Sequence, residues 1–298
     1  MINCPLCNKN SVYLVEEGFI DEQPFNIFEC SFCGLFWSEN IEEADEKHYN
    51  FVEWYGNRWE FKEVIKFINC KDSKILEIGC GKGFFLKMVK KKCKIYGIDI
   101  NKNAINYAKK KFNLDNIYHE KIDSFLLRNQ TDFDIVCAFH LLEHLKDPKD
   151  FVSKISQILK LNGFLCLSVP NPNRVSLNLI GREYWDYPPH HLTRWNKKSI
   201  KYLLENSGFK ILKIIEEPLS IFTCTEAVGT FLQKFFIKSR ENKKIFFKKR
   251  KKIFFNLKIF LKPIFMTLFL PIGFLIYLIG KIKRFNGQSI LVVAKKQT

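Results

Sequence analysis

The N-terminus lacks the apolar run that a secretory signal peptide requires. Residues 1–10 read MINCPLCNKN, in which no hydrophobic stretch reaches signal-peptide length. We therefore expect a cytoplasmic, reducing environment in which disulfide bonds do not form. The cysteines outside the two Cys-x2-Cys pairs are scattered among apolar neighbours, so we expect small core residues there rather than bridges.

Acidic residues are nearly absent from one long segment. The chain has 48 Lys and Arg against 31 Asp and Glu, a formal net charge of +17. Residues 219–287 hold 15 of the basic residues and only two acids, Glu226 and Glu241, so this segment alone carries +13. It also holds 13 of the 30 Phe. The rest of the chain is close to balance, so the protein has one basic, Phe-rich segment rather than a generally basic surface.

Long uncharged runs are also scarce. Residues 263–280 are 18 residues without a charge, short of the roughly 20 that a transmembrane helix needs, and Pro271 and Gly273 interrupt them. We expect an interfacial or re-entrant helical element, together with the Lys- and Phe-rich run Lys243–Lys262, on an anionic membrane surface. There are three alternatives for this segment: a soluble lid over a substrate pocket, a dimer interface, or a nucleic-acid-binding surface.

The N-terminal part contains four closely paired cysteines. They are Cys4, Cys7, Cys30 and Cys33, with 22 residues between the two pairs. This spacing is typical of one tetrahedral zinc site, and four thiolates leave no open position, so we expect a structural zinc. A zinc ribbon that binds nucleic acid is the alternative, but residues 1–46 have ten acids against the single Lys9, which would repel phosphate.

From residue 74 onward, apolar runs alternate with helical stretches. The runs are 74–79, 94–99, 116–122, 133–138 and 163–169, and the helical stretches include 84–92, 103–112 and 149–160. This alternation predicts an α/β fold, with a parallel sheet covered by helices on both faces. Residues 47–70 have helical spacing and many aromatic residues, which predicts a linker helix.

Three glycines follow the first of these strands. The string Glu77-Ile-Gly79-Cys-Gly81-Lys-Gly83 lets a ligand approach the backbone, although its third glycine is one position too early for the dinucleotide fingerprint. Asp99 ends the second strand about 20 residues later, where a carboxylate can accept hydrogen bonds from ribose hydroxyls. Asp123 and Ser124 follow the third strand, where an acid can reach an adenine amino group.

Four of the six histidines lie in two short strings. FHLLEHL, with His140, Glu143 and His144, follows the fourth strand, and PPHHLTRW, with His190 and His191, follows the fifth.

These ordered motifs, over about residues 70–216 plus the last strand, resemble the class I S-adenosylmethionine-dependent methyltransferases, in the ubiquinone-methyltransferase-like branch. The resemblance implies a doubly wound, seven-stranded, mostly parallel Rossmann-like sheet whose last strand is antiparallel. It implies that 209–216 and 288–295 are hairpin partners and that 219–287 are inserted between them. It implies S-adenosylmethionine as cofactor, bound by Glu77, Gly79, Cys80, Gly81, Gly83, Asp99, Ile100, Asp123, Ser124 and His140.

Methyl transfer to a hydroxyl or a carbon acid requires removal of a proton, for which histidine suits neutral pH. The catalytic candidates are His140, Glu143, His144, His190 and His191. Three roles stay open for His140, Glu143 and His144: they brace neighbouring loops, perform acid–base chemistry, or bind a divalent metal. Some relatives have an E-x-x-E-H string that binds a metal, but in this chain His140 replaces the first acid of that string. Two interpretations stay open for His190 and His191. One of them acts as a base or contacts the acceptor, or both pack within a loop beside Trp185, Tyr187 and Trp195.

We expect four parts: a zinc-ribbon-like module (1–46), a linker helix (47–70), a methyltransferase domain (71–218 with 288–298) and a membrane-associating insertion (219–287). The predicted function is methyl transfer to a small or lipid-linked acceptor, such as a sugar, glycan-lipid or quinone-type precursor, at the cytoplasmic membrane face. An RNA methyltransferase and a non-catalytic membrane-tethered binding module are the alternatives. The Asn/Asp-Pro-Pro-Tyr-type string frequent in base-amine methylases does not follow the fourth strand.

Overall fold

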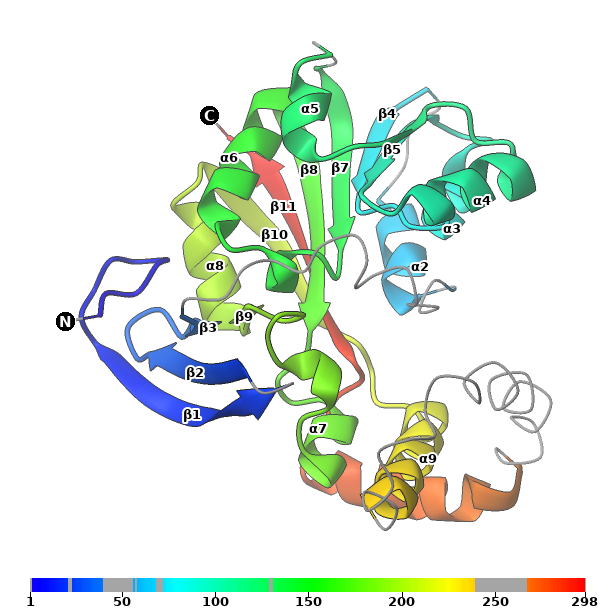
Figure 1. Cartoon of the computed structure of the whole chain (residues 1–298). Coiled ribbons are helices and arrows are strands. Elements are labelled where there is room, and N and C mark those ends of the chain that lie inside the picture. Colours follow the sequence, from blue (N-terminus) through cyan, green and yellow to red (C-terminus); the bar gives the residue numbers. More distant parts are fainter. Residues whose placement is uncertain are drawn as a thin grey trace. The chain divides into compact units, whose positions relative to one another are not determined.

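A computed structural model describes residues 2–20, 23–39, 56, 58–67, 72–128, 131–238 and 267–297 (Figure 1). The chain forms two compact units. Unit 1 comprises Met1–Pro170, Tyr184–Ile215 and Ser289–Thr298, and unit 2 comprises Asn171–Glu183 and Glu216–Gln288. The run Lys243–Lys262, and much of the linker expected at 47–70, lie outside the described residues.

Unit 1 is built on a seven-stranded sheet of order β10-β11-β8-β7-β4-β5-β6. Its strands are β4 (Lys74–Ile78), β5 (Lys94–Asp99), β6 (Ile117–His119), β7 (Phe133–Phe139), β8 (Leu159–Pro170), β10 (Phe209–Glu216) and β11 (Ser289–Lys296). The pairs of β4 with β5 and β7, β5 with β6, and β7 with β8 are parallel. β11 runs antiparallel to β8, so the predicted mostly parallel sheet with an antiparallel last strand is confirmed.

Helices cover both faces of this sheet (Figure 1). They are α2 (Trp59–Ile65), α3 (Phe84–Val89), α4 (Lys102–Phe112), α5 (Ile122–Leu126), α6 (Pro148–Ile158) and α8 (Lys197–Glu205). Neighbouring strand residues enter different cores: Leu76 packs in the cluster with α5, α6 and α8, whereas Ile75 packs in the one with α2, α3 and α4. This period-two alternation of apolar side chains buries both faces, as a covered parallel sheet requires.

The third predicted strand is shorter than the sequence suggests. The apolar run 116–122 forms a strand only to His119, because α5 already begins at Ile122. Asp123 and Ser124 therefore lie in the first turn of a helix rather than in a loop.

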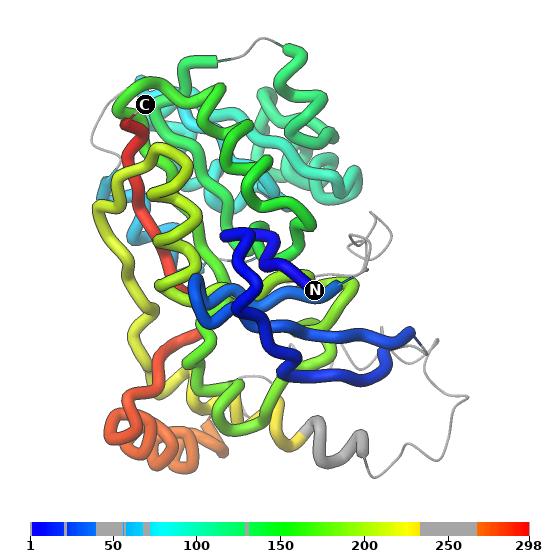
Figure 2. The backbone as a smooth tube through the Cα atoms, turned by 90° about the vertical axis from the view of Figure 1, so that its left-hand side faces the viewer, coloured from blue at the N-terminus to red at the C-terminus, as the bar shows by residue number. Residues whose placement is uncertain are grey.

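The N-terminal residues form a second sheet of order β1-β2-β3-β9. β1 (Val12–Ile20) and β2 (Gln23–Cys30) form a hairpin, drawn in blue in Figure 2, and β3 (Phe36–Ser38) pairs with β2. The fourth strand, β9 (Thr193–Arg194), comes from the PPHHLTRW string and pairs with β3. The N-terminal sheet is therefore completed by the chain that follows the fifth strand of the main sheet.

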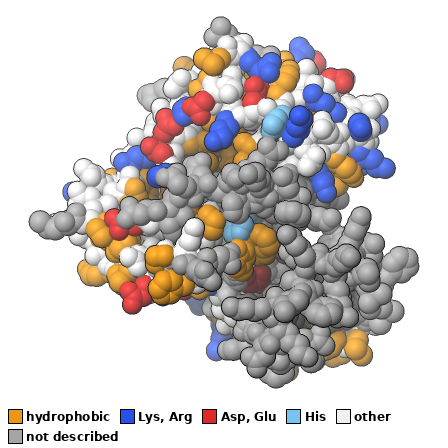
Figure 3. Space-filling view, viewed as in Figure 1, with side chains coloured by type: hydrophobic (Ala, Val, Ile, Leu, Met, Phe, Trp, Pro, Cys, Tyr) orange, Lys and Arg blue, Asp and Glu red, His pale blue; other side chains and the backbone are white. Residues whose placement is uncertain are grey.

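Positive charge is not spread evenly over unit 1. Lys and Arg side chains gather over α3 and α4 on the face shown in Figure 3. Lys109, Lys110 and Lys111 occupy the last turn of α4. Lysines at that position stabilise the helix through the negative end of its dipole, which accounts for a local cluster without a ligand.

Unit 2 is helical where it is described. It contains α7 (Val175–Ile180), α9 (Ile221–Lys238) and a helix at 267–282. Cys224 and Ala227 of α9 pack with Val175, Ile276 and Tyr277 in a small core. Gly273 lies so close to α9 that a Cβ there would be 2.0 Å from the Thr225 hydroxyl. No helix among the described residues is both long enough and apolar enough to span a bilayer.

Candidate active site

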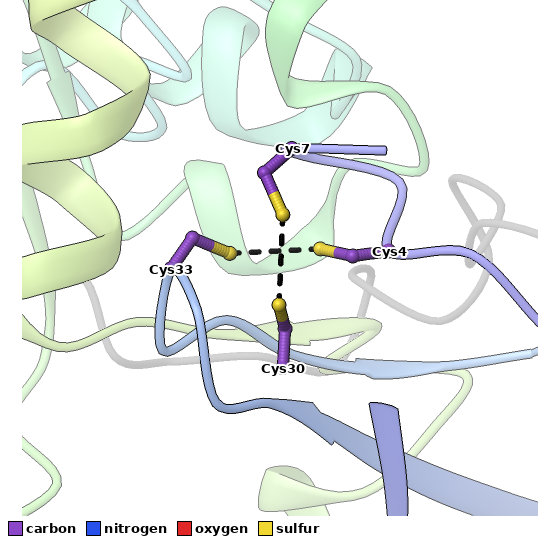
Figure 4. A group of neighbouring side chains, drawn as sticks. All are labelled: Cys4, Cys7, Cys30 and Cys33. Atoms are coloured by element: carbon purple, nitrogen blue, oxygen red, sulfur yellow. Dashed lines mark hydrogen bonds between the residues drawn. The ribbon is translucent and has the colours of Figure 1, made fainter. Parts of the chain in front are cut away.

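The four N-terminal cysteines converge on one point (Figure 4). Their Sγ atoms all lie within 4.8 Å of one another, and the Cys4–Cys33 and Cys7–Cys30 pairs are each separated by 3.5 Å. Sulfurs around a tetrahedral zinc, with Zn–S bonds of about 2.3 Å, lie about 3.8 Å apart. The donor set and its spacing therefore fit Zn²⁺, held by four ligands in a closed, structural site.

Backbone geometry brings the second cysteine pair into place. Cys30 ends β2, and Gly34 takes a left-handed conformation, with φ +76°, directly after Cys33. The hydrogen bond with Cys33 lowers the pKa of the Cys4 thiol to about 5, and the same contact, with burial, raises the pKa of Cys33. The close contact between these sulfurs therefore favours a thiolate in the cluster, which is the form that binds a metal cation.

The glycine loop connects β4 to α3 through three left-handed residues. Gly79, Gly81 and Gly83 have φ of +74°, +50° and +72°. A Cβ on Gly83 would also lie 2.6 Å from Leu114 Cδ1. Both the conformation and the space therefore require glycine at Gly83. The loop is also held by its own amides: those of Gly79 and Cys80 donate to the carbonyl of Ile98, and that of Gly83 donates to the carbonyl of Cys80.

Asp99 ties this loop to the end of β5. Its Oδ2 accepts a hydrogen bond from the amide of Gly81 at 2.7 Å, and its Oδ1 accepts one from the amide of Asn101 at 2.7 Å. Asn101 in turn caps α4 by accepting from the amide of Ala104. The predicted ribose ligand is thus part of the frame that shapes the glycine loop.

Glu77 is a buried carboxylate beneath the loop. Burial and the nearby Asp99 raise its pKa, and its Oε2 has no hydrogen-bond partner among the described residues. A buried acid without a donor suits a cationic or hydrogen-bond-donating ligand. Cys80, the neighbouring predicted ligand, is buried as well, and burial raises the pKa of its thiol.

The predicted adenine ligands have other partners. Asp123 is exposed and forms an ion pair with Lys154 of α6 at 2.5 Å, and Ser124 is exposed beside it. The carbonyl of Ile100 accepts a hydrogen bond at 2.9 Å from Nε2 of His119, which the sequence did not single out.

His140 lies between two buried carboxylates. It follows β7 directly, with φ +50°. Its Nε2 is 2.8 Å from Oε1 of Glu60, and its Nδ1 is 3.4 Å from Oε1 of Glu143. Burial and Arg58 lower the pKa of His140, but the hydrogen bonds to Glu143 and Glu60 outweigh them and raise it. Both ring nitrogens face acids, which favours the imidazolium, a form with no lone pair to accept a proton.

Glu60 is a residue that the sequence analysis missed. It lies on α2, is 2% exposed, and its pKa is held at about 2 because the bonds to His140 outweigh the cost of burial. An acid between Trp59 and Phe61 on an aromatic helix was the available signal. Its partner is 80 positions away, so local spacing could not identify it.

Glu143 and His144 lie in a single 3-10 turn (Leu142–His144). Burial opposes ionisation of Glu143, but the surrounding imidazoles, His140 first, hold its pKa at about 2. Nδ1 of His144 donates to the carbonyl of His190 at 2.6 Å, so the neutral ring carries its lone pair on Nε2. Burial lowers the pKa of His144 to about 4, which keeps the ring neutral at physiological pH.

The two histidines of the second string point to different surroundings. The ring of His191 is 4.9 Å from that of His144, and its Nδ1 is 3.6 Å from Oδ1 of Asp186. The ring of His190 packs against Trp185 at 4.6 Å. Ligand atoms of Glu143, His144 and His191 all lie within 4.8 Å of one another. His191 therefore joins the candidate site, whereas the ring of His190 is part of an aromatic cluster.

The loop that carries these histidines is anchored from both sides. The amide of Leu192 donates to the carbonyl of Glu143, and the hydroxyl of Thr193 donates to the carbonyl of Leu142. On the other side, the β3–β9 pairing and a 2.6 Å hydrogen bond from the Tyr187 hydroxyl to Glu16 hold it to the N-terminal sheet. The N-terminal sheet that carries the four cysteines therefore supports the candidate acceptor loop.

Comparisons with known proteins agree with this geometry. A family model described as a methyltransferase domain matches residues 54–214. The mitochondrial ubiquinone biosynthesis O-methyltransferase of Schizosaccharomyces pombe is 30% identical over 183 residues, covering 54% of this chain and 62% of that protein. The Bradyrhizobium diazoefficiens ubiquinone biosynthesis O-methyltransferase is 30% identical over 164 residues, covering 49% of this chain and 63% of its own. The matched part of the chain thus spans less than two thirds of the length of each of these two relatives.

Solved structures show the same fold. A chain from the complex of the Haloferax volcanii Trm112 methyltransferase activator with a proposed methyltransferase matches with a TM-score of 0.51 and 14% identity, covering 85% of this chain and 94% of that one. A proposed methyltransferase from Bacillus halodurans matches with a TM-score of 0.50 and 16% identity, covering 80% of this chain and 99% of that one.

Proposed function

The chain belongs to the methyltransferase-domain family, with the class I S-adenosylmethionine-dependent fold, and from this premise we propose that it methylates a hydroxyl group of a small or lipid-linked acceptor. One observation supports an acceptor site in particular: the side chains of Glu143 and His144 in the 3-10 turn lie next to His191 of the following loop. The hydroxyl acceptor follows from the names of the two ubiquinone biosynthesis O-methyltransferases.

The cofactor end supplies binding and orientation. When bound, S-adenosylmethionine supplies an electrophilic methyl group on a sulfonium. Gly79, Gly81 and Gly83 would present backbone to it, Glu77 offers a buried acid, and Asp99 fixes the loop through the Gly81 amide. We propose Cys80, Ile100, Asp123 and Ser124 as further contacts. For Asp123 this requires its carboxylate to exchange Lys154 for the ligand.

The acceptor end supplies a proton acceptor. His144 is neutral, and its Nε2 lone pair can take the proton of an acceptor hydroxyl as the oxygen is methylated. His191, beside it, is the second candidate for this role. His140, bound by Glu60 and Glu143, instead holds the turn in place as a cation beside the methyl-donor site.

The same three side chains support a second role, as ligands of a divalent cation. Oε2 of Glu143 is buried and lacks a hydrogen-bond partner among the described residues, and Oε1 lies 3.4 Å from Nδ1 of His140. Glu143, His144 and His191 could therefore bind a cation that orients acceptor hydroxyls. Turnover that is lost in EDTA and restored by Mg²⁺ or Mn²⁺ selects the metal role, whereas turnover unaffected by EDTA selects the base.

We place the reaction at the cytoplasmic face of a membrane, where a sugar, glycan-lipid or quinone-type precursor would be carried by a lipid. The support is the charge of residues 219–287, which carry 15 basic residues against two acids and 13 Phe.

The test is transfer of labelled methyl from S-adenosylmethionine to separate lipid, soluble-metabolite and RNA fractions. We expect label in the lipid or metabolite fraction. Label in RNA alone would overturn the proposal in favour of an RNA methyltransferase. Binding of S-adenosylhomocysteine with no transfer to any fraction would favour a non-catalytic binding module.

A further inference from the structure

The helix at 267–282 in unit 2 leaves most of its apolar side chains uncovered. One stripe of it, Phe269, Gly273, Ile276 and Gly280, is buried or half-buried. Gly273 lies against Thr225 of α9, and Gly280 lies against Leu219. The spacing of i, i+4, i+7 and i+11 is that of one helical face, so the helix uses this face to pack within its own unit.

The neighbouring face is equally apolar but exposed. Leu268, Ile272, Leu275, Ile279 and Ile282 repeat with the same spacing, and between 41% and 82% of each side chain is exposed. We call these five residues the apolar stripe. On the remaining side, Leu270, Phe274 and Leu278 are exposed as well. A soluble monomer rarely presents so large a contiguous apolar surface to water.

The charge distribution favours one kind of occupant for this surface. Residues 267–280 contain no charged side chain, and the positive charges Lys281, Lys283 and Arg284 follow directly at the end of the helix. A coiled-coil seam between two copies is a single apolar stripe bordered by charges of both signs. A helix that is apolar on every exposed side, with cations following its C-terminal end, instead matches a bilayer interface, where the cations reach anionic headgroups.

Helix α9 of the same unit also exposes apolar side chains. Phe222 and Phe231 of α9 are 59% and 50% exposed. Aromatic and aliphatic side chains of this kind enter the boundary between headgroups and acyl chains, and each one buried there adds to the binding free energy.

We infer that the apolar stripe docks unit 2 onto an anionic lipid surface, with Lys281, Lys283 and Arg284 at the headgroups. This inference rests on the part of the proposed function that places the enzyme at a membrane, and not on methyl transfer. It assigns the membrane contact to described residues of one helix.

The test is co-flotation of the full chain with vesicles in a sucrose gradient, without cofactor or acceptor. Neutral vesicles of phosphatidylcholine are compared with anionic vesicles, in which phosphatidylcholine and phosphatidylglycerol are mixed at about 7:3. We expect the full chain to bind the anionic vesicles at least about 10-fold more tightly than the neutral ones, because several lysines face the headgroups.

Two pairs of substitutions test the stripe. Leu275→Ser with Ile279→Ser should weaken binding to both vesicles by roughly 100-fold, since two apolar side chains no longer enter the interface. Leu268→Ser with Ile282→Ser should do the same and guards against a folding defect in one variant. The matched control is Leu127→Ser in unit 1, whose side chain is 83% exposed and which should bind like the parent chain. Lys281→Ser with Lys283→Ser should weaken binding only to the anionic vesicles, and only at low salt.

Two results in the vesicle assay would overturn the inference. The first is that the parent chain does not bind the vesicles. The second is that both stripe variants bind as tightly as the parent, which would show that the contact lies outside the apolar stripe. A dimer that either stripe variant converts to a monomer would identify a second copy of the chain as the occupant instead. S-adenosylhomocysteine binding is measured on the same samples, so loss of vesicle binding is distinguishable from failure of the methyltransferase proposal.

Discussion

The cofactor end and the acceptor end of unit 1 are built in different ways. The proposed cofactor end is local: Glu77, the glycine loop, Asp99 and Asn101 lie within 25 consecutive positions, and the amides of Gly81 and Asn101 both donate to the Asp99 carboxylate. The acceptor end joins His140 to Glu60 across 80 positions, and Tyr187 to Glu16 across 171. A local frame can be recognised from spacing, whereas the acceptor end depends on the assembled fold and on the zinc-ribbon-like module.

The largest expected effect follows from removing one of the four clustered cysteines, the proposed zinc ligands. Cys30→Ser should prevent zinc binding and disorganise β2, β3 and the loop that β9 anchors, because a structural zinc contributes on the order of 10 kcal/mol to folding. We expect turnover to fall at least about 100-fold while affinity for S-adenosylhomocysteine changes little. Metal content, turnover and calorimetric binding measure this. Cys224→Ser, at a buried cysteine of unit 2, is the control, and equal loss of cofactor affinity in Cys30→Ser would contradict the separation of the two ends.

A second substitution attacks the cofactor end. Gly83→Val places a β-branched residue at φ +72°, with its Cβ 2.6 Å from Leu114. The strain and the overpacking together should lower the free energy of unfolding by about 3 kcal/mol and abolish S-adenosylhomocysteine binding. Gly181→Ala provides the matched comparison, since it has φ +77° with nothing within 4 Å of the new Cβ. It should cost less and leave binding intact. Normal cofactor affinity in Gly83→Val would show that this loop does not hold the ligand.

The acceptor chemistry is tested by the two neighbouring histidines. His191→Ala should lower turnover about 100-fold with unchanged cofactor affinity, because it removes a polar group beside His144 and Glu143. His190→Ala removes a ring that packs on Trp185 and should lower the melting temperature more than the chemical step. Steady-state kinetics and thermal unfolding separate the two. Unchanged turnover in His191→Ala would remove it from the site.

The smallest effect concerns Glu60 and has a pH signature. Its folded pKa of about 2 lies below the ordinary 4.5, so its carboxylate stabilises the fold fully above pH 4.5, and this stability is lost as pH falls toward 2. Glu60→Gln should be less stable than the parent by about 2 kcal/mol at neutral pH, with the difference shrinking between pH 4.5 and 2. Denaturant titrations across this range measure it. Glu63→Gln, on the same helix with an exposed Lys66 partner, should show no such dependence, and a pH-independent difference for Glu60→Gln would refute the ion pair with His140.

The sequence was most informative where chemistry and spacing coincide. The alternation of strands and helices, the glycine loop and the four cysteines follow from periodicity and from residue types that few other sites use, whereas the antiparallel last strand came from the family resemblance. The third strand is shorter than predicted, because β6 ends at His119, the charged Glu120 and Lys121 follow, and the chain enters α5 at Ile122. Glu60 and the Tyr187–Glu16 contact were not predictable, because each depends on a partner brought close only by the complete fold.

The two-residue strand β9 has a consequence for how this protein can be built and altered. The N-terminal sheet is complete only when Thr193 and Arg194 have been added beside Phe36 and Trp37. During synthesis, its last edge must therefore stay open until the chain has passed that point. In protein engineering, a module transplanted from another chain would keep its metal but lose its fourth strand, so residues 1–39 and the 184–196 loop should be exchanged together as one cassette.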